Sequence, residues 1–233
     1  MSILRATTTV AFLITAALST SANAILWEPG KYSYNQARNF GNKSYIRGTG
    51  KAPGCTASLI GAKWVIGAKH CMGGSASSLW FKVDNKGARL LVAQKYTNSS
   101  GDVGLMRLKT NAPSGAFKAA PYASTDERGK VFTKAGFGGH GPINNISNGT
   151  PRDLLAGKNK IARVSSNGIR FFLDGDVKKE VNTWFGDSGG PAFVKKSGKW
   201  YVFGTTWRGR GTRDGEDGRV SQVRNWIKNV SGI

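Results

Sequence analysis

Short runs of apolar residues, many of them β-branched or aromatic, recur from residue 57 onward, and glycine-rich turns separate them. Runs of this length and composition between turn signals predict β-strands. The predicted strands span residues 57–60, 64–66, 79–83, 90–93, 103–108, 131–136, 161–164, 169–173, 192–194 and 200–207. This pattern predicts an all-β protein.

The spacing of apolar residues changes only near the end of the chain. There they repeat at helical intervals, which predicts one C-terminal α-helix; the repeating residues are Val220, Val223, Trp226, Ile227 and Val230. Residues 111–130 contain two prolines and several small residues. This stretch is typical of a linker, so we expect the strands to fall into two halves on either side of it.

Residues 1–24 have the pattern of a secretory signal peptide. Arg5 gives a positive start, residues 10–18 form an apolar core, and Ala22-Asn23-Ala24 fits a small-x-small cleavage site. A membrane anchor is the alternative, but the apolar run is well short of the ~20 residues that a spanning helix needs. We therefore expect an exported protein, extracellular or periplasmic, whose mature chain begins at Ile25 and has no membrane span.

The chain is strongly basic, with 34 lysines and arginines against 13 acidic residues and a formal net charge of +21. Because these basic residues are scattered, the plainest interpretation is a solvated surface. The aromatic-and-basic motifs of nucleic-acid modules are absent from the sequence, so we expect no specific nucleic-acid partner. Non-specific attraction to acidic surfaces or polyanions would still follow from such a charge.

The chain has two cysteines, Cys55 and Cys71. In an exported protein such a pair predicts a disulfide. It would close a loop of about 17 residues and stabilise the fold by ~3 kcal/mol in the chain-entropy model. It would also hold the turn that carries the neighbouring His70.

The most specific chemical signal is the run Gly186-Asp187-Ser188-Gly189-Gly190-Pro191. Its glycines permit a tight, exposed turn that presents one serine hydroxyl. On such a turn the N–H groups of Gly186 and Ser188 converge on one point, where they stabilise negative charge on an acyl oxygen. Ser188 is therefore a candidate nucleophile, and it needs a base.

The chain offers two histidines as that base. His70 ends an apolar run and precedes Cys71, whereas His140 lies in a glycine-rich loop and is read as structural. Asp102 opens the apolar run at residues 103–108 and is a candidate for orienting the imidazole. The alternatives are a structural His70 and an Asp102 that caps the start of a strand.

The order histidine, aspartate, serine and the three local motifs resemble the chymotrypsin-type, or trypsin-like, serine endopeptidases. The resemblance covers roughly residues 25–233. A chain with only one disulfide is similar to the bacterial-type members of this family. Lys69 and Gly104 stand where alanines are usual. The resemblance implies two packed six-stranded β-barrels with a C-terminal helix. The N-terminal barrel would span about 25–120 and the C-terminal barrel about 121–233.

The same resemblance implies a function. Ser188 would attack the scissile carbonyl, His70 would accept and return the proton, and Asp102 would hold the tautomer of His70. Substrates would be proteins or peptides, the enzyme would be a monomer, and no metal or organic cofactor is implied. The competing function is a cationic, protease-like binding or antimicrobial protein without significant hydrolysis. Loss of a triad residue would favour that alternative, and none is lost.

The resemblance also places a substrate pocket, formed by Asn182, Thr206, Trp207, Arg208 and Gly218. Asn182 would form its floor and is neutral, so the acid that marks a preference for Arg or Lys is absent at that point. Arg208 stands where glycine is usual. Acidic residues at 214, 216 and 217 offer negative charge by another route, and polar, basic and small substrate side chains all remain open.

The last implied feature is an activation pair. In the family, a free N-terminal Ile or Val inserts into the protein and its ammonium group pairs with the aspartate before the nucleophile. Here these residues are Ile25 and Asp187, although Trp27 and Glu28 replace the glycines that usually follow the first two residues. The alternative is that Asp187 pairs with an internal lysine or arginine.

Overall fold

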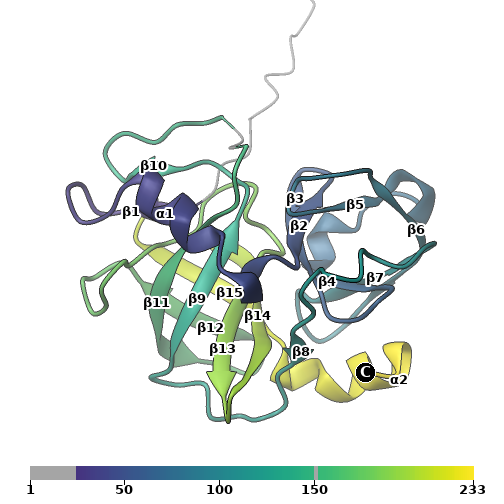
Figure 1. The fold of residues 1–233 in the computed structure, drawn as a ribbon. Coiled ribbons are helices and arrows are strands. Elements are labelled where there is room, and N and C mark those ends of the chain that lie inside the picture. The colour runs from purple at the N-terminus through teal and green to yellow at the C-terminus, as the bar shows by residue number, and fades with distance from the viewer. Residues whose placement is uncertain (1–24, 150–151) are drawn as a thin grey trace, which may run out of the picture.

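The computed structural model describes residues 25–149 and 152–233. The expected signal peptide, residues 1–24, lies outside the described residues. Two β-barrels lie side by side, and a C-terminal helix lies below them in Figure 1. No helix in the described part of the chain combines the length and apolarity needed to cross a membrane.

The first barrel closes in the strand order β2-β3-β4-β7-β6-β5. Its strands are β2 (Thr49–Ala52), β3 (Cys55–Leu59), β4 (Trp64–Gly67), β5 (Trp80–Val83), β6 (Leu90–Thr97) and β7 (Gly104–Leu108), with a short 3-10 turn, η3 (Ala76–Ser78), before β5. Alternate residues of these strands point inward, as the period of a β-strand requires. Leu59, Val65, Phe81 and Met106 fill the interior and are at most 2% exposed.

The second barrel is a seven-stranded sheet that the β13–β14 pairing closes into six strands, with β8 left at its edge. The strands are β8 (Ala120–Pro121), β9 (Val131–Gly136), β11 (Leu155–Val164), β12 (Gly168–Phe172), β13 (Pro191–Lys196), β14 (Lys199–Gly209) and β15 (Asp214–Arg219). Phe132 packs edge-on against Phe171 and Phe203 in its core. The predicted all-β fold with two six-stranded barrels is therefore confirmed.

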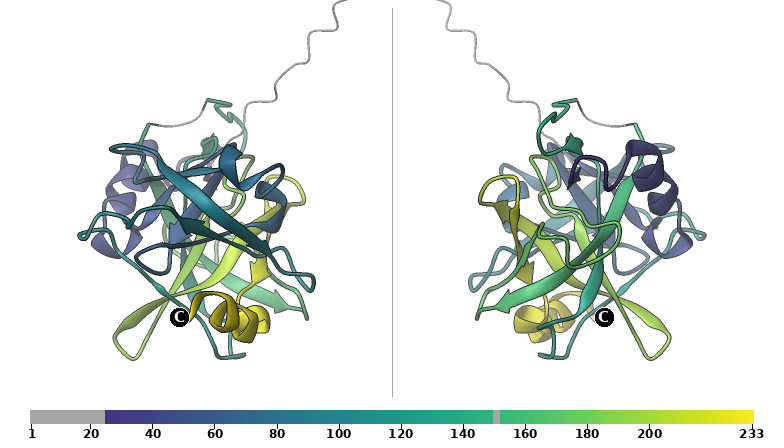
Figure 2. Two further views of the ribbon diagram at one scale, coloured as in Figure 1. Left: turned by 90° about the vertical axis from the view of Figure 1, so that its right-hand side faces the viewer. Right: turned by 90° about the vertical axis from the view of Figure 1, so that its left-hand side faces the viewer.

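The two barrels share one apolar interface. Ile66 and Leu105 from the first barrel belong to the same buried cluster as Phe193 and Val202 from the second. The helix α2 (Arg224–Ser231) follows the turn η4 (Ser221–Val223) and adds Ile227 to that cluster. The predicted C-terminal helix is confirmed, and it lies at the same end of the molecule in both views of Figure 2. Because the core is continuous, the cleft between the barrels is held rigidly.

The segment before β2, grouped with the N-terminal barrel on sequence, packs against the second barrel. β1 (Leu26–Trp27) pairs with β10 (Gly141–Pro142), and α1 (Tyr34–Gly41) contacts β11 before the turn η1 (Ser44–Ile46). Its apolar side chains explain this position, because they are buried in one cluster with residues of the second barrel: Ile25, Trp27, Tyr32 and Ala37 with Leu155 and Val181. Ile25, the first described residue, is thereby brought close to the loops of the second barrel.

Candidate active site

His70 and Asp102 come from the first barrel and form a hydrogen-bonded pair. His70 lies on the 3-10 turn η2 (Lys69–Cys71) after β4, and Asp102 lies just before β7. His70 Nδ1 lies 2.7 Å from Asp102 Oδ2, and the backbone N–H of His70 donates to Oδ1 at 3.0 Å. Asp102 is 7% exposed. Both carboxylate oxygens therefore fix the same residue, which leaves His70 Nε2 as the ring nitrogen for another partner.

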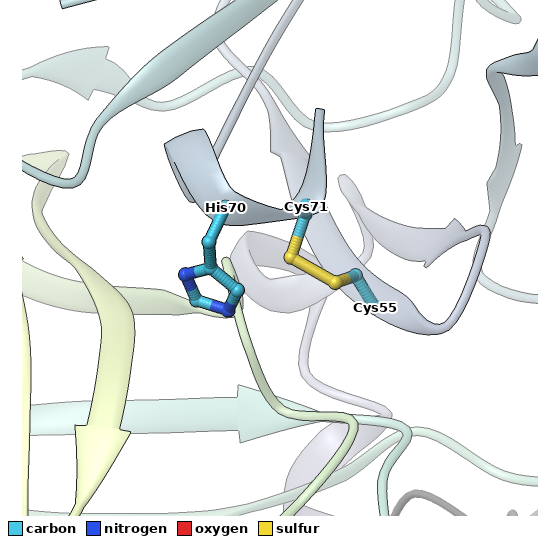
Figure 3. Close-up of side chains that lie close together, drawn as sticks. All are labelled: Cys55, His70 and Cys71. Carbon is cyan, nitrogen blue, oxygen red and sulfur yellow. A yellow bond between two sulfur atoms is a disulfide. The ribbon is translucent and has the colours of Figure 1, made fainter. Parts of the chain in front are cut away.

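A disulfide fixes the turn that carries His70. Cys71 on η2 is bonded to Cys55 on β3, with a Cα–Cα distance of 6.2 Å (Figure 3). The predicted disulfide is confirmed. The ligand-type atoms of Cys55, His70 and Cys71 lie within 4.8 Å of one another. They do not form a metal site, because the two sulfur atoms are bonded to each other.

Ser188 lies in the nucleophile loop, residues 184–190, which connects to β13. Gly186 has φ 89° and Gly189 has φ 76°, angles that favour glycine. A Cβ on Gly189 would come within 2.5 Å of the Thr56 carbonyl oxygen and 2.7 Å of the Ala68 nitrogen. Glycine at position 189 therefore lets the loop pack directly against the first barrel.

The peptide units of the nucleophile loop are held by their carbonyl groups. Gly139 N–H donates to the Phe185 carbonyl at 3.3 Å, and Gly190 N–H donates to the Asp187 carbonyl at 2.6 Å. Because the N–H of a trans peptide points opposite to its C=O, these bonds set the directions of the Gly186 and Ser188 N–H groups. Within the described residues neither of these two N–H groups donates to another protein atom. Both are free to stabilise an oxyanion.

Thr56 on β3 holds the carbonyl groups of Gly186 and Ser188, the same residues whose N–H groups are free of protein partners among the described residues. Its backbone N–H donates to the Ser188 carbonyl at 2.9 Å, and its Oγ1 donates to the Gly186 carbonyl at 2.9 Å. The N–H of Phe137 in turn donates to Thr56 Oγ1 at 3.1 Å. Thr56 thus ties the nucleophile loop to both barrels, a role that its place just before the apolar run 57–60 did not reveal.

A cavity of about 450 Å³ lies beside these groups. Its lining includes His70 and Ser188 together with Thr206, Trp207 and Arg208. The structure therefore brings the candidate nucleophile, the candidate base and three of the five expected pocket residues to one cavity. A substrate side chain placed here would lie next to the scissile bond.

Arg208 is held along the wall of this cavity. Its guanidinium carbon lies 3.9 Å from the ring centroid of Trp207, and its Nε donates to Glu216 Oε2 at 2.8 Å. Arg210 lies 3.5 Å from the same carboxylate oxygen. Stacking and the ion pair together fix the side chain in one direction. Its charge is balanced by Glu216.

Asn182 and Gly218 lie elsewhere than in this lining. Asn182 is fully buried, its Nδ2 donates to the Thr212 carbonyl at 2.8 Å, and its Oδ1 has no partner among the described residues. A Cβ on Gly218 would come within 3.0 Å of the Asp102 carbonyl oxygen, so Gly218 lies against Asp102. The glycine next to the Asn182 side chain is Gly215.

A buried charged cluster lies behind the nucleophile loop. Asp187, Asp217 and Lys134 are each completely buried, and Lys134 Nζ lies 2.5 Å from Asp217 Oδ1. Burial raises the pKa of Asp187 well above its usual range and also raises the pKa of Asp217. The charge of Lys134 and the amides of Trp184 and Gly138 favour the ionised form of Asp187 in the opposite direction.

Every acidic residue of β15 has a basic partner in the structure. These pairs are Asp214 with Arg170, Glu216 with Arg208 and Asp217 with Lys134. None of these acids therefore offers an unpaired negative charge to a basic substrate side chain. In the sequence, only Lys134 hinted at one of these pairs, because it is the one charged residue in the strand β9.

The chain is similar in sequence to known proteins. A family model described as Trypsin matches residues 31–227. The chain is 28% identical over 200 residues to "Serine protease SP24D" of Anopheles gambiae, which covers 77% of this chain and 72% of that protein. It is 23% identical over 213 residues to "Transmembrane protease serine 11G" of Rattus norvegicus, over 77% of this chain. The match spans half the length of that rat relative.

Proposed function

Because the chain belongs to the trypsin family of serine proteases, we propose that it is a serine endopeptidase that acts through Ser188, His70 and Asp102. The observation that carries the proposal is the cavity lined by both Ser188 and His70, with the His70 ring held 2.7 Å from Asp102. The N–H groups of Gly186 and Ser188 supply the third requirement, a site for the oxyanion. No metal or organic cofactor is needed for this chemistry.

In the first half of the reaction, Ser188 Oγ forms a bond to the carbonyl carbon of the scissile peptide. His70 Nε2 takes the hydroxyl proton as the bond forms, and the carbonyl electron pair moves onto oxygen. The Gly186 and Ser188 N–H groups bind that oxyanion. His70 then gives the proton to the leaving nitrogen as the C–N bond breaks, which leaves an acyl-enzyme on Ser188.

The second half repeats these steps with water as the nucleophile. His70 accepts a proton from water, the hydroxide attacks the acyl carbon, and the proton returns to Ser188 Oγ as the ester bond breaks. Throughout, Asp102 keeps the Nδ1 proton of His70 in place and stabilises the imidazolium that forms. Asp102 keeps its negative charge in each step.

The substrate backbone would pair with β14 at Thr206 and Trp207, and the side chain before the scissile bond would enter the cavity. Arg208 narrows that cavity, because its guanidinium lies along the wall. Asn182 remains the proposed floor, reached through Thr183, which lines the cavity. Gly218 would act through its contact with the backbone of Asp102.

Charge balance supports the activation pair of Ile25 and Asp187. In the buried cluster one ammonium group, that of Lys134, faces two carboxylates. Ile25 is fully buried, and its neighbour Leu26 exchanges two backbone hydrogen bonds with Asn182, at 2.9 and 2.8 Å. Cleavage after Ala24 would release an ammonium group on Ile25 that supplies the second positive charge. On this account Lys134 belongs to Asp217 and the new N-terminus belongs to Asp187.

Export follows from the same account. Residues 1–24 would direct secretion and be removed, and the disulfide suits an extracellular or periplasmic protein. The substrates would be proteins or peptides, and the enzyme would act as a monomer. No propeptide beyond the signal is required, because signal cleavage alone exposes Ile25.

A peptide library tests this function directly. The mature chain from Ile25 should cleave a defined subset of the library, and Ser188→Ala should abolish the cleavage without changing the thermal midpoint. The profile of cleaved sequences also identifies the side chain that the cavity accepts. A folded mature chain that cleaves nothing would replace the proposal with the alternative, a cationic protease-like binding or antimicrobial protein.

A further inference from the structure

A second cavity, of about 660 Å³, lies on the second barrel and has an unusual charge composition. Its lining includes five lysines and no acidic residue. We call it the lysine groove and define it by these residues: Lys43, Lys158, Lys178, Lys179 and Lys195. They come from α1–η1, β11, the β12–β13 connection and β13, on the side of the second barrel that faces the viewer in Figure 1.

The lysines of the lysine groove form no ion pairs among the described residues. All five lysines are exposed, and in the part of the chain that the structure describes none of them lies within 4.0 Å of a carboxylate. Other lysines of the same barrel do find acids: Lys130 and Lys196 pair with Asp126, and Lys160 pairs with Asp176.

Two of these lysines contact the same aromatic ring. The ammonium groups of Lys43 and Lys179 each lie 5.5 Å from the ring centroid of Phe40, so at most about twice that distance separates them. Ring contacts of this kind stabilise cations. An extended acidic segment with carboxylates a few residues apart would contact both ammonium groups.

The floor of the groove is apolar and opens where two strands part. β9 pairs with β13 at Lys134 and Thr133, whereas β9 continues to Val131 and β13 continues to Lys196. Val131 is 46% exposed at this opening and adds an apolar side chain to the lining. A ligand that carries apolar groups as well as negative charge would therefore complement the groove.

The rings in the groove are already engaged. Trp200 stacks on Tyr45 with the ring centroids 3.6 Å apart, and Lys195 lies 6.0 Å from the centroid of Trp200. The Phe40 ring is contacted by two ammonium groups. Little ring surface is left for stacking nucleobases, which disfavours nucleic acid. A sulfated polysaccharide carries the charge but lacks apolar side chains for Val131.

We propose that the lysine groove binds an acidic polypeptide segment in which carboxylates alternate with apolar side chains. The carboxylates would contact the lysines at the rim, and the apolar side chains would cover Val131 and the strand opening. This site is separate from the proposed catalysis at Ser188, so either can fail without the other.

Fluorescence anisotropy tests the proposal with a fluorescein-labelled peptide of glutamates interspersed with leucines. The protein is the mature chain carrying Ser188→Ala, which cannot cleave the probe. The test variant is Lys43→Gln with Lys179→Gln. The matched control is Lys109→Gln with Lys228→Gln, two exposed lysines outside the groove that change the net charge by the same amount.

The proposal predicts saturable binding that weakens with salt, about tenfold weaker in the groove variant and unchanged in the control variant. Equal weakening by both variants would overturn it, since general charge would then explain the binding. So would equal affinity for a glutamate peptide without leucines, because the apolar floor would then play no part. A sulfated polysaccharide that binds at the groove while the peptide does not would replace the proposed ligand with a polysaccharide.

Discussion

The cleft and the lysine groove differ in how many of their charged side chains form ion pairs. In and behind the cleft most charged side chains form ion pairs, as in Arg208–Glu216 and Lys134–Asp217, and Asp187 is the buried acid there that has none among the described residues. In the lysine groove five ammonium groups have no carboxylate among their lining residues. A reaction on an uncharged peptide group needs fixed positions and compensated charges. A surface with uncompensated charge is suited to a charged ligand from outside.

The largest effect that separates the two regions is expected from Asp102→Asn. The asparagine would hold His70 in the wrong tautomer, so kcat should fall about 10⁴-fold, the loss that this change causes in proteases of this family. The measurement is kcat on a peptide substrate identified from the library. Anisotropy of the acidic peptide should be unchanged in the same variant. A loss below about tenfold would mean that Asp102 caps a strand and does not orient His70.

A blocked N-terminus should have the next largest effect. A chain that begins Met-Ile25 lacks the α-ammonium group, so Asp187 stays buried with its pKa raised by burial. Loss of one partner from a buried pair costs ~3–5 kcal/mol, which predicts a fall in activity of at least a hundredfold. Equal activity of the two chains would show that Lys134 alone serves Asp187.

The activation pair also has a pH signature. A free α-amine has a pKa of about 7.7–8.0, and pairing with Asp187 would raise the pKa of the Ile25 amine in the folded state. Its stabilisation is then full below the unfolded pKa and is lost as pH rises through the raised folded pKa. The urea midpoint of the mature chain should therefore fall above about pH 8, whereas that of the Met-Ile25 chain should not fall there.

Substitution of Thr56 tests whether the position of the nucleophile loop depends on hydrogen bonds from the first barrel. Thr56→Val keeps the shape but leaves the Gly186 carbonyl and the Phe137 N–H without their partner, at ~1–3 kcal/mol for each buried group. We expect kcat to fall about tenfold with little change in KM. Thr56→Ser, which keeps the hydroxyl, should restore kcat. If KM rises and kcat falls together in both variants, Thr56 has only a structural role.

The smallest effect is expected at Arg208, where the cleft meets solvent. Arg208→Gly removes the guanidinium from the cavity wall, so bulky side chains should be accepted with a gain in kcat/KM of less than about tenfold. The library profile of this variant, compared with that of the wild type, measures the change. An unchanged profile would show that the side chain of Arg208 does not limit the cavity.

Local sequence patterns predicted much of the scaffold. β9 spans the predicted residues 131–136, and the two cysteines form the predicted disulfide. Apolar alternation did not predict β15, whose sequence from Asp214 to Arg219 is polar. That strand pairs with β12 and β14, and Arg170, Arg208 and Lys134 each neutralise one of its acids. Such partners are distant in sequence, so periodicity carries no signal for them.

The site was predictable only in part for the same reason. The Ser188 motif and the His70–Cys71 pair are local signals. The hydrogen bonds of Thr56 to the nucleophile loop span more than 100 positions, for example from Thr56 to Gly186. The lysine groove gathers single lysines from separate elements, which in the sequence look like a scattered, solvated charge. Tertiary contacts create both features.

The central claim is that Ser188 is an activated nucleophile. It is tested most directly by treating the mature chain with a phosphonylating serine reagent and mapping the adduct by peptide mass. The account predicts one adduct for each molecule, on the Ser188 peptide, and none after denaturation or in His70→Ala. A folded, mature protein that stays unlabelled at Ser188 would contradict it.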